Sequence, residues 1–187
     1  MKLSLACGNR VPEGFEGVDV SPKVDPDHVV DLLSFPWPWE DESVDEIECF
    51  HFIEHIPLGT NEAEPFFQFF DEMFRIMAPA TFDPNSPNIP LTGFATIEAP
   101  YYTSMRATMD PTHRRFISEG TFLYLNRKWR ADNKLEHYPV DCDFDYTYSY
   151  NIDGQWALRS QETQAFAFKH YANVIDDIRV TLVKTPR

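Results

Sequence analysis

Three short apolar segments occupy the first 32 residues of the chain, and each ends close to a glycine or an aspartate. Apolar runs of this length, bounded by turn residues, predict buried strands. Only the residues from Asn9 to Gly14 separate the first two, which is fewer than the ten or more that a crossover between parallel strands takes up. The chain is therefore constrained to a sheet whose first connection is a loop. The three segments are residues 3–6, 15–20 and 28–32, with Gly8, Asp19 and Asp31 at their ends.

The rest of the chain alternates between strand patterns and one clear amphipathic helix, which predicts an α/β fold. In this helix phenylalanine and methionine recur at helical spacing from Phe66 to Met77. Asn61 and Glu64 form a capping-box pattern before it, and Glu62 adds first-turn charge. Further strands are expected at residues 43–50, 94–99, 144–150 and 178–183, a second helix at 118–126 with Ser118 as its cap, and a proline-rich loop at 79–92.

The composition limits the class of protein. A length of 187 residues suits one domain, so we expect a single unit over residues 1–187. No stretch approaches the roughly 20 apolar residues of a membrane span, and the N-terminus lacks the apolar region of a signal peptide. The three cysteines are far apart and form no Cys-x-x-Cys pair, which indicates a reduced, cytoplasmic protein.

The charge is unevenly distributed. The net charge of −14 argues against nucleic-acid binding, which needs a basic face. Residues 1–100 contain 19 acidic and 4 basic side chains, whereas residues 101–187 contain 11 and 12, with seven bases between Arg106 and Lys134. An acidic first half suits a cationic cofactor and the basic cluster suits an anionic acceptor, unless both are ordinary solvated surface.

The ends of the first strands carry groups that suit an adenosine-containing ligand. In an open α/β sheet, ligands bind beyond the carboxyl ends of the strands. Gly8 allows a close approach of the backbone there, and the carboxylate of Asp19 can accept both hydroxyls of a ribose. The alternative is that Asp19 and Asp31 are solvated surface acids.

The order of the short motifs along residues 3–126 is more specific than any one of them. They are Leu5-Ala6-Cys7-Gly8, Gly17-Val18-Asp19, Val30-Asp31-Leu32, Pro36-Trp37-Pro38, Ser43-Val44-Asp45-Glu46-Ile47 and His51-Phe52-Ile53-Glu54-His55-Ile56. In this order they resemble the class I S-adenosylmethionine-dependent methyltransferases, particularly the broad type 11 group of small enzymes. The resemblance implies a Rossmann-like, mostly parallel sheet with helices on both faces, an antiparallel closing strand and a first crossover helix reduced to a loop.

The resemblance also implies a cofactor, S-adenosylmethionine, and a set of residues that bind it. The family's GxGxxG is reduced here to Cys7-Gly8-Asn9-Arg10, a departure that puts the affinity for the cofactor in question more than the fold. The implied contacts are Ala6, Cys7 and Gly8 to the amino-acid part, Asp19 with Val20 to the ribose, Asp31 with Leu32 to the adenine, and His51 beside the methyl donor.

The segment His51-Phe52-Ile53-Glu54-His55 also matches HxxEH, a zinc-peptidase motif. Zinc binding by this motif needs both histidines on one face of a continuing helix. Pro57 disfavours helix at Ile56, so we expect no metal here. Glu54 or His55 is instead expected to cap or support the loop.

A second polar segment, Asp110-Pro111-Thr112-His113-Arg114-Arg115, follows the predicted fifth strand, where the family places its acceptor. His113 is expected to accept a proton from a hydroxyl or amine acceptor, with His51 as a second catalytic candidate. Asp110, His113, Arg114 and Arg115 are the expected acceptor-binding residues, and either arginine suits an anion. The alternative is an internal ion pair between Asp110 and Arg115 that only shapes the loop.

The expected activity is methyl transfer to a small, unidentified acceptor, without nucleic acid or membrane as partner. Such a transfer depends mainly on positioning, which can supply roughly 7–11 kcal/mol of the barrier. One rival is a non-catalytic module that binds the cofactor or a nucleoside on the same fold. A second rival, an NAD enzyme, is disfavoured because the turn lacks the second and third glycines that admit a pyrophosphate.

Overall fold

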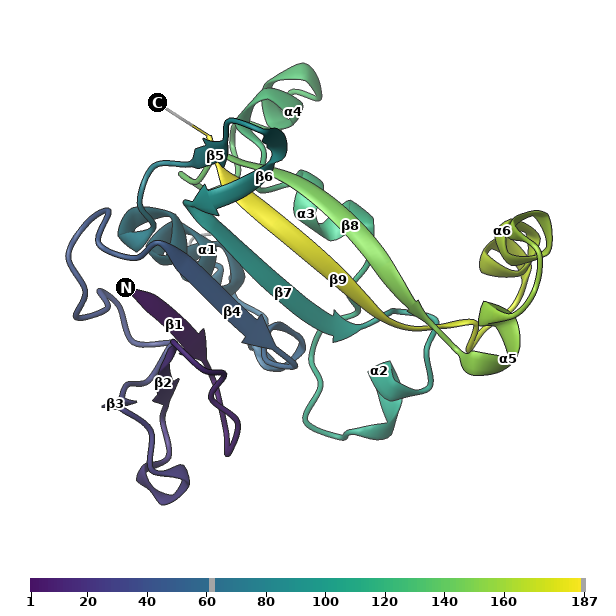
Figure 1. The fold of residues 1–187 in the computed structure, drawn as a ribbon, viewed down its shortest axis with the longest axis horizontal. Helices are drawn as coiled ribbons and strands as arrows, with labels where there is room; N and C mark the ends of the chain where they lie inside the picture. The colour runs from purple at the N-terminus through teal and green to yellow at the C-terminus, as the bar shows by residue number, and fades with distance from the viewer. Residues whose placement is uncertain (61–62, 186–187) are drawn as a thin grey trace.

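The computed structural model describes residues 1–60 and 63–185. Its centre is a seven-stranded sheet in the order β3-β2-β1-β4-β7-β9-β8 (Figure 1). The strands from β3 to β7 pair in parallel, whereas β9 is antiparallel to both β7 and β8. The mostly parallel sheet with an antiparallel closing strand is thus confirmed. The strands are β1 (Lys2–Leu5), β2 (Glu16–Asp19), β3 (His28–Val29), β4 (Glu46–Phe50), β7 (Phe94–Pro100), β8 (Phe144–Ile152) and β9 (Ile175–Lys184).

The connection between β1 and β2 contains turns and no helix, as the spacing in the sequence predicts. This loop lies against β2 in place of a crossover helix. A β-carbon added at Gly17 would lie 2.5 Å from Cγ2 of Val11 and 3.0 Å from the sulfur of Cys7. Glycine at position 17 therefore leaves the space in which the loop packs.

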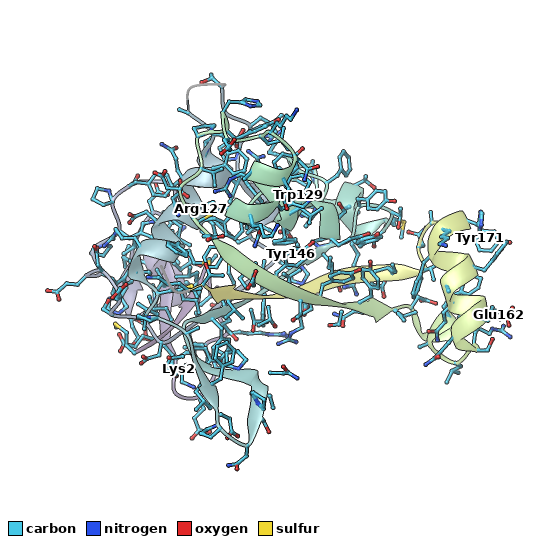
Figure 2. All side chains as sticks on the ribbon, turned by 90° about the horizontal axis from the view of Figure 1, so that it is seen from above. Lys2, Arg127, Trp129, Tyr146, Glu162 and Tyr171 are labelled. Carbon is cyan, nitrogen blue, oxygen red and sulfur yellow. The ribbon has the colours of Figure 1, made fainter. Side chains whose placement is uncertain are left out.

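The helices that pack on the sheet lie over one of its faces. Side chains of β1, β4 and β7 that point to this face are apolar and buried, whereas those on the other face include Lys2, Glu48 and Thr96. Figure 2 shows Trp129 and Tyr146 on the helix side of the sheet and Lys2 on the other. The resemblance predicts helices on both faces; without the first crossover helix, the polar face carries the β1–β2 loop instead. The helices are α1 (Pro65–Ile76), α2 (Arg106–Met109), α3 (Glu119–Leu123), α4 (Arg127–Asp132), α5 (Gly154–Ala157) and α6 (Gln161–His170), with 3₁₀ turns η1 (Pro22–Val24) and η2 (Ile53–His55).

The aromatic side chains of helix α1 fill the space between this helix and the sheet. Phe74 packs edge-on against Phe144 of β8 with ring centroids 5.1 Å apart, and Phe70 packs against Phe122 of α3 at 6.4 Å. Such pairs add to the free energy gained from burial alone. The buried residues of the helix are Phe66, Phe67, Phe69, Phe70, Met73, Phe74 and Ile76.

The predicted start of this helix is resolved in part. Asn61 and Glu62 lie outside the described residues. The helix begins at Pro65, and Glu64 is its N-cap, with a carboxylate that accepts the backbone N–H of Phe66 at 3.1 Å. Proline suits this first helical position because its missing N–H has no partner there in any case.

Arg75 of α1 fixes the aromatic segment between β3 and β4. Its guanidinium donates to the backbone carbonyls of Trp37 at 3.1 Å and Trp39 at 2.9 Å. It also pairs with Glu72 at 2.6 Å and with Asp41 at 2.7 Å. Both tryptophans are buried and belong to the core.

Two predicted elements differ in the structure. Residues 79–92 are not a plain loop but contain the hairpin β5 (Thr81–Asp83) and β6 (Ser86–Thr92), which lies in front of the sheet in Figure 1. Its prolines are tolerated because each strand of a lone hairpin has one edge that donates no hydrogen bond. The predicted helix 118–126 begins at Ser118 but is split after Leu123, since Asn126 caps α4 by accepting the N–H of Trp129.

Smaller differences concern strand ends. The predicted strand 28–32 pairs only at His28–Val29, and the strand predicted from residue 43 begins at Glu46 after one isolated bridge at Val44.

In residues 1–60 and 63–185, no helix combines the length and hydrophobicity that crossing a membrane requires. Cys7, Cys49 and Cys142 are all free thiols.

Replacing Arg75 with Met is expected to lower the free energy of unfolding by about 2–3 kcal/mol, because hydrogen bonds to charged groups contribute about 1.5–3 kcal/mol each and Glu72 would keep only the N–H of Trp37 as a partner. Urea unfolding measures the loss. Lys128→Met, which breaks an exposed pair with Asp132, should change stability by under about 0.5 kcal/mol. Equal losses in the two variants would show that Arg75 does not fix the aromatic segment.

Candidate functional site

The turn after β1 and the end of β2 are joined by hydrogen bonds. The N–H of Gly8 donates to Oδ2 of Asp19 at 3.1 Å, and the N–H of Ser21 donates to Oδ1 at 2.8 Å. Ala6 and Gly8 both have a positive φ, near +53°, a conformation that costs free energy at an alanine. Asp19 is thereby held against the turn, and each of its oxygens keeps a lone pair for a further donor.

A first cleft of about 380 Å³ opens beside this turn. It follows the polar face of β1 and β4 toward their carboxyl ends, and it includes three residues that sequence analysis did not single out: Arg10, Glu48 and Glu98. Glu48 accepts the hydroxyl of Ser4 at 2.8 Å. The residues that line the first cleft include Ala6, Cys7, Arg10, Glu48, His51 and Glu98.

The predicted cofactor-binding residues divide into three groups. Ala6, Cys7 and His51 line the first cleft, and Gly8 and Asp19 face each other at the turn. Burial, followed by the charge of Asp19, raises the pKa of the Cys7 thiol, so the thiol stays protonated at neutral pH.

The remaining three lie further along the edge of the sheet. Val20 is 63% exposed, and Asp31 is exposed and closes a turn by accepting the N–H of Leu33 and the hydroxyl of Ser34. The side chain of Leu32 is buried in the core, so only its backbone is available to a ligand.

A second cleft of about 560 Å³ adjoins the first, and His51 lines both. The second cleft brings together the two polar segments that sequence analysis treated separately. Its lining residues include His51, Glu54, His55, Arg106, Asp110 and His113.

Backbone hydrogen bonds hold these two segments together. The carbonyl of Glu54, in the 3₁₀ turn η2, accepts the N–H groups of Arg114 at 2.7 Å and Arg115 at 3.1 Å. His51-to-His55 thus forms a single tight turn and not the continuing helix of a zinc peptidase, in agreement with the expectation from Pro57. No sequence pattern indicates this pairing because the two segments are about 60 positions apart.

Hydrogen bonds fix the tautomers of two histidines. Nδ1 of His113 lies 3.1 Å from the carbonyl of Ala107, which can only accept, so Nδ1 carries a proton. The hydroxyl of Thr112 donates its one proton to Asp110 at 2.6 Å, so Nδ1 of His55, 3.0 Å away, donates to that hydroxyl. In the neutral rings, Nε2 of each is left with its lone pair.

His51 lies where the clefts meet, in a strained backbone conformation with φ of +54°. Its Nδ1 lies 3.6 Å from a carboxylate oxygen of Glu54, and its Nε2 lies 3.7 Å from Glu98. Contact with the Glu54 carboxylate is the main cause that raises the pKa of His51.

The two predicted acceptor-binding arginines have different environments. Arg115 donates to the carbonyls of Ile56 at 2.9 Å and Pro57 at 2.5 Å, and it pairs with Glu64. The alternative pair between Asp110 and Arg115 is therefore not formed, and the guanidinium of Arg115 is occupied by the chain itself. The Arg114 side chain is exposed.

No family model matches the sequence. No curated protein matches it either. The fold, in contrast, resembles many solved structures, although the identities are low.

A SAM-dependent methyltransferase from Archaeoglobus fulgidus aligns with a TM-score of 0.62 and 16% identity over 98% of this chain and 85% of that one. Geranyl diphosphate C-methyltransferase from Streptomyces coelicolor, solved with S-adenosyl-L-homocysteine, has a TM-score of 0.54 and 12% identity over 98% and 70%. The [4+2]-cyclase SpnF has a TM-score of 0.56 and 14% identity over 100% and 75%. The chain has the fold of the class I S-adenosylmethionine-dependent methyltransferases.

Proposed function

We propose that this protein binds S-adenosylmethionine in the first cleft and transfers its methyl group to a small acceptor in the second. The observation that carries the proposal is the pair of adjoining clefts at the carboxyl edge of the parallel strands, with His51 common to both. Ligands of open α/β sheets bind at this edge. Two clefts that meet at one point suit the transfer of a group from one ligand to another.

The residues of the first cleft fit the proposed cofactor. S-adenosylmethionine, when bound, supplies an electrophilic methyl group on a sulfonium sulfur. Glu48 and Glu98 bring negative charge into the cleft, which favours a ligand with sulfonium and ammonium groups. Asp19 with Val20 would hold the ribose, and Asp31 with the backbone of Leu32 would hold the adenine further along the edge.

The residues of the second cleft would hold and deprotonate the acceptor. Of the two predicted bases, His51 suits proton acceptance better because it lines both clefts, whereas His113 lines only the second. A positioned base contributes about 10²–10⁴-fold to such a rate. Arg114 is the predicted arginine that is available to an anionic acceptor.

The fold alone does not establish methyl transfer, because the same fold occurs in a [4+2]-cyclase. The discriminating measurement is turnover. A methyltransferase converts S-adenosylmethionine to S-adenosylhomocysteine when an acceptor is present, whereas a binding module shows affinity without conversion.

Asp19→Ala is expected to weaken S-adenosylmethionine binding at least tenfold, because each charge-assisted hydrogen bond to the ribose is worth about 1.5–3 kcal/mol. Isothermal titration calorimetry measures the affinity, and circular dichroism checks the fold. Asp132→Ala, on the exposed surface of α4, is the control and should bind normally. Equal affinity in the two variants would refute the assignment of Asp19 to the ribose.

Arg114→Ala is expected to raise the apparent KM for the acceptor and to leave the affinity for S-adenosylmethionine unchanged, because we assign this exposed cation to the acceptor and not to the cofactor. Acceptors are first identified by transfer of labelled methyl groups to a panel of small molecules sorted by charge. Lys134→Ala, a substitution in the same basic stretch but after α4, is the control. The idea of an anionic acceptor fails if only neutral compounds are methylated or if Arg114→Ala has normal kinetics.

A further inference from the structure

Glu54 is a buried carboxylate without a hydrogen bond. Its side chain is 1% exposed, and in the described part of the chain neither of its oxygens has a hydrogen-bond partner. Leaving an ionised carboxylate in this state is costly, so buried acids are normally paired or coordinate a cation. The surroundings of Glu54 should therefore supply a partner.

Two imidazoles lie near enough to Glu54 to act as this partner. Oε1 of Glu54 lies 3.6 Å from Nδ1 of His51 and 3.9 Å from Nε2 of His113. Both separations are longer than the usual length of a hydrogen bond, by about 1 Å or less. Catalytic hydrogen bonds are often long in free enzymes and shorten only when substrates bind.

The two imidazoles are not equivalent. The proton on Nδ1 of His113 is committed to Ala107, so the nitrogen that faces Glu54 has a proton only when the ring is charged. His51 can place its Nδ1 proton toward Glu54 while the ring is neutral. Nε2 of His51 then has the lone pair and can accept a proton where the clefts meet.

A metal ion is a second way to satisfy Glu54. Glu54, His55 and His113 offer ligand atoms within 4.8 Å of one another. Two ligands of one ion are at most about 4.2 Å apart, twice a bond of about 2.1 Å. Oε1 of Glu54 and Nε2 of His113, 3.9 Å apart, lie within that limit. A metal is thus the competing link to a proton, and the metal content of the purified protein distinguishes the two.

We propose that Glu54 is a positioning residue that accepts the Nδ1 proton of His51 and so makes Nε2 the proton acceptor for methyl transfer. When the acceptor hydroxyl or amine loses its proton, that proton bonds to Nε2, and the charged ring is stabilised by the Glu54 carboxylate. No oxidant or further reactant is needed. The inference rests on the proposed function, which supplies the acceptor.

Glu54 is rigid enough for this task. Its carbonyl is fixed by the N–H groups of Arg114 and Arg115, and its side chain points from the one-turn helix η2 into the interior. A carboxylate behind a histidine holds the ring in one tautomer and stabilises its charged form. Other charges also face His51: Glu98, which Arg179 approaches at 3.5 Å, and Asp177, which pairs with Arg106.

The test is nitrogen-15 NMR of the histidine rings in the wild type, Glu54→Gln and the control Glu98→Gln. In the wild type we expect neutral His51 to be protonated at Nδ1. In Glu54→Gln we expect a mixture of tautomers and a lower pKa of His51, because the contact with the carboxylate is lost. Glu98→Gln should keep the Nδ1 tautomer, since Glu98 faces Nε2.

Three results would overturn the proposal. One is a His51 tautomer that Glu54→Gln leaves unchanged, and another is protonation at Nε2 in the wild type. The third is stoichiometric metal in the purified protein, removable by a chelator, which would make Glu54 a ligand. Circular dichroism of Glu54→Gln establishes that the variant folds, and Glu54→Asp should restore part of the Nδ1 signal.

Calorimetry with S-adenosylmethionine separates this proposal from the proposed function. Binding to Glu54→Gln should match the wild type, because Glu54 lines only the second cleft. With an acceptor in hand, Glu54→Gln should lower kcat about tenfold or more with little change in the cofactor affinity. Failure of the wild type to bind the cofactor would refute the proposed function and leave the tautomer result standing.

Discussion

The packing of α1 against one face of the sheet determines the rest of the structure. Seven of its side chains are buried, and its phenylalanines reach both β8 and α3. Burial of an aromatic side chain contributes about 1.5–3 kcal/mol, so this layer stabilises the sheet near the site. Because α1 and α3 cover the apolar face, the polar face is free to line the first cleft with Glu48 and Glu98.

The position of the site follows from this arrangement. η2 precedes α1 in the chain, and the loop of Asp110 to Arg115 follows β7. Both segments leave the carboxyl edge of adjacent parallel strands, β4 and β7, which brings Glu54 and His113 together. The hydrogen bonds from Arg114 and Arg115 to Glu54 then fix the distance between them.

Much of this fold is predictable from local sequence, because strand ends and an amphipathic helix depend on near neighbours. The loop crossover before Asp19 follows from the short spacing, and α1 follows from its repeated phenylalanines. The hairpin within residues 79–92 is not predictable in this way, since its prolines argue against strands unless both outer edges are free.

The site was less predictable because its contacts join distant segments. The sequence indicates that Asp110 and Arg115 are neighbours, but Arg115 instead contacts Ile56 and Glu64. The shared role of His51 in two clefts, and the burial of Glu54 behind it, depend on the turn geometry of η2.

The pair of strands β8 and β9 extends past the rest of the sheet and ends in α5 and α6 (Figures 1 and 2). Most of α6 is exposed, and Gln164 bonds within the same unit, to the carbonyls of Trp156, Ala157 and Arg159. A unit with so few buried contacts can open locally while the core stays folded. Amide protons of α6 should therefore exchange with solvent through local opening, whereas those of β7 exchange only when the whole sheet unfolds.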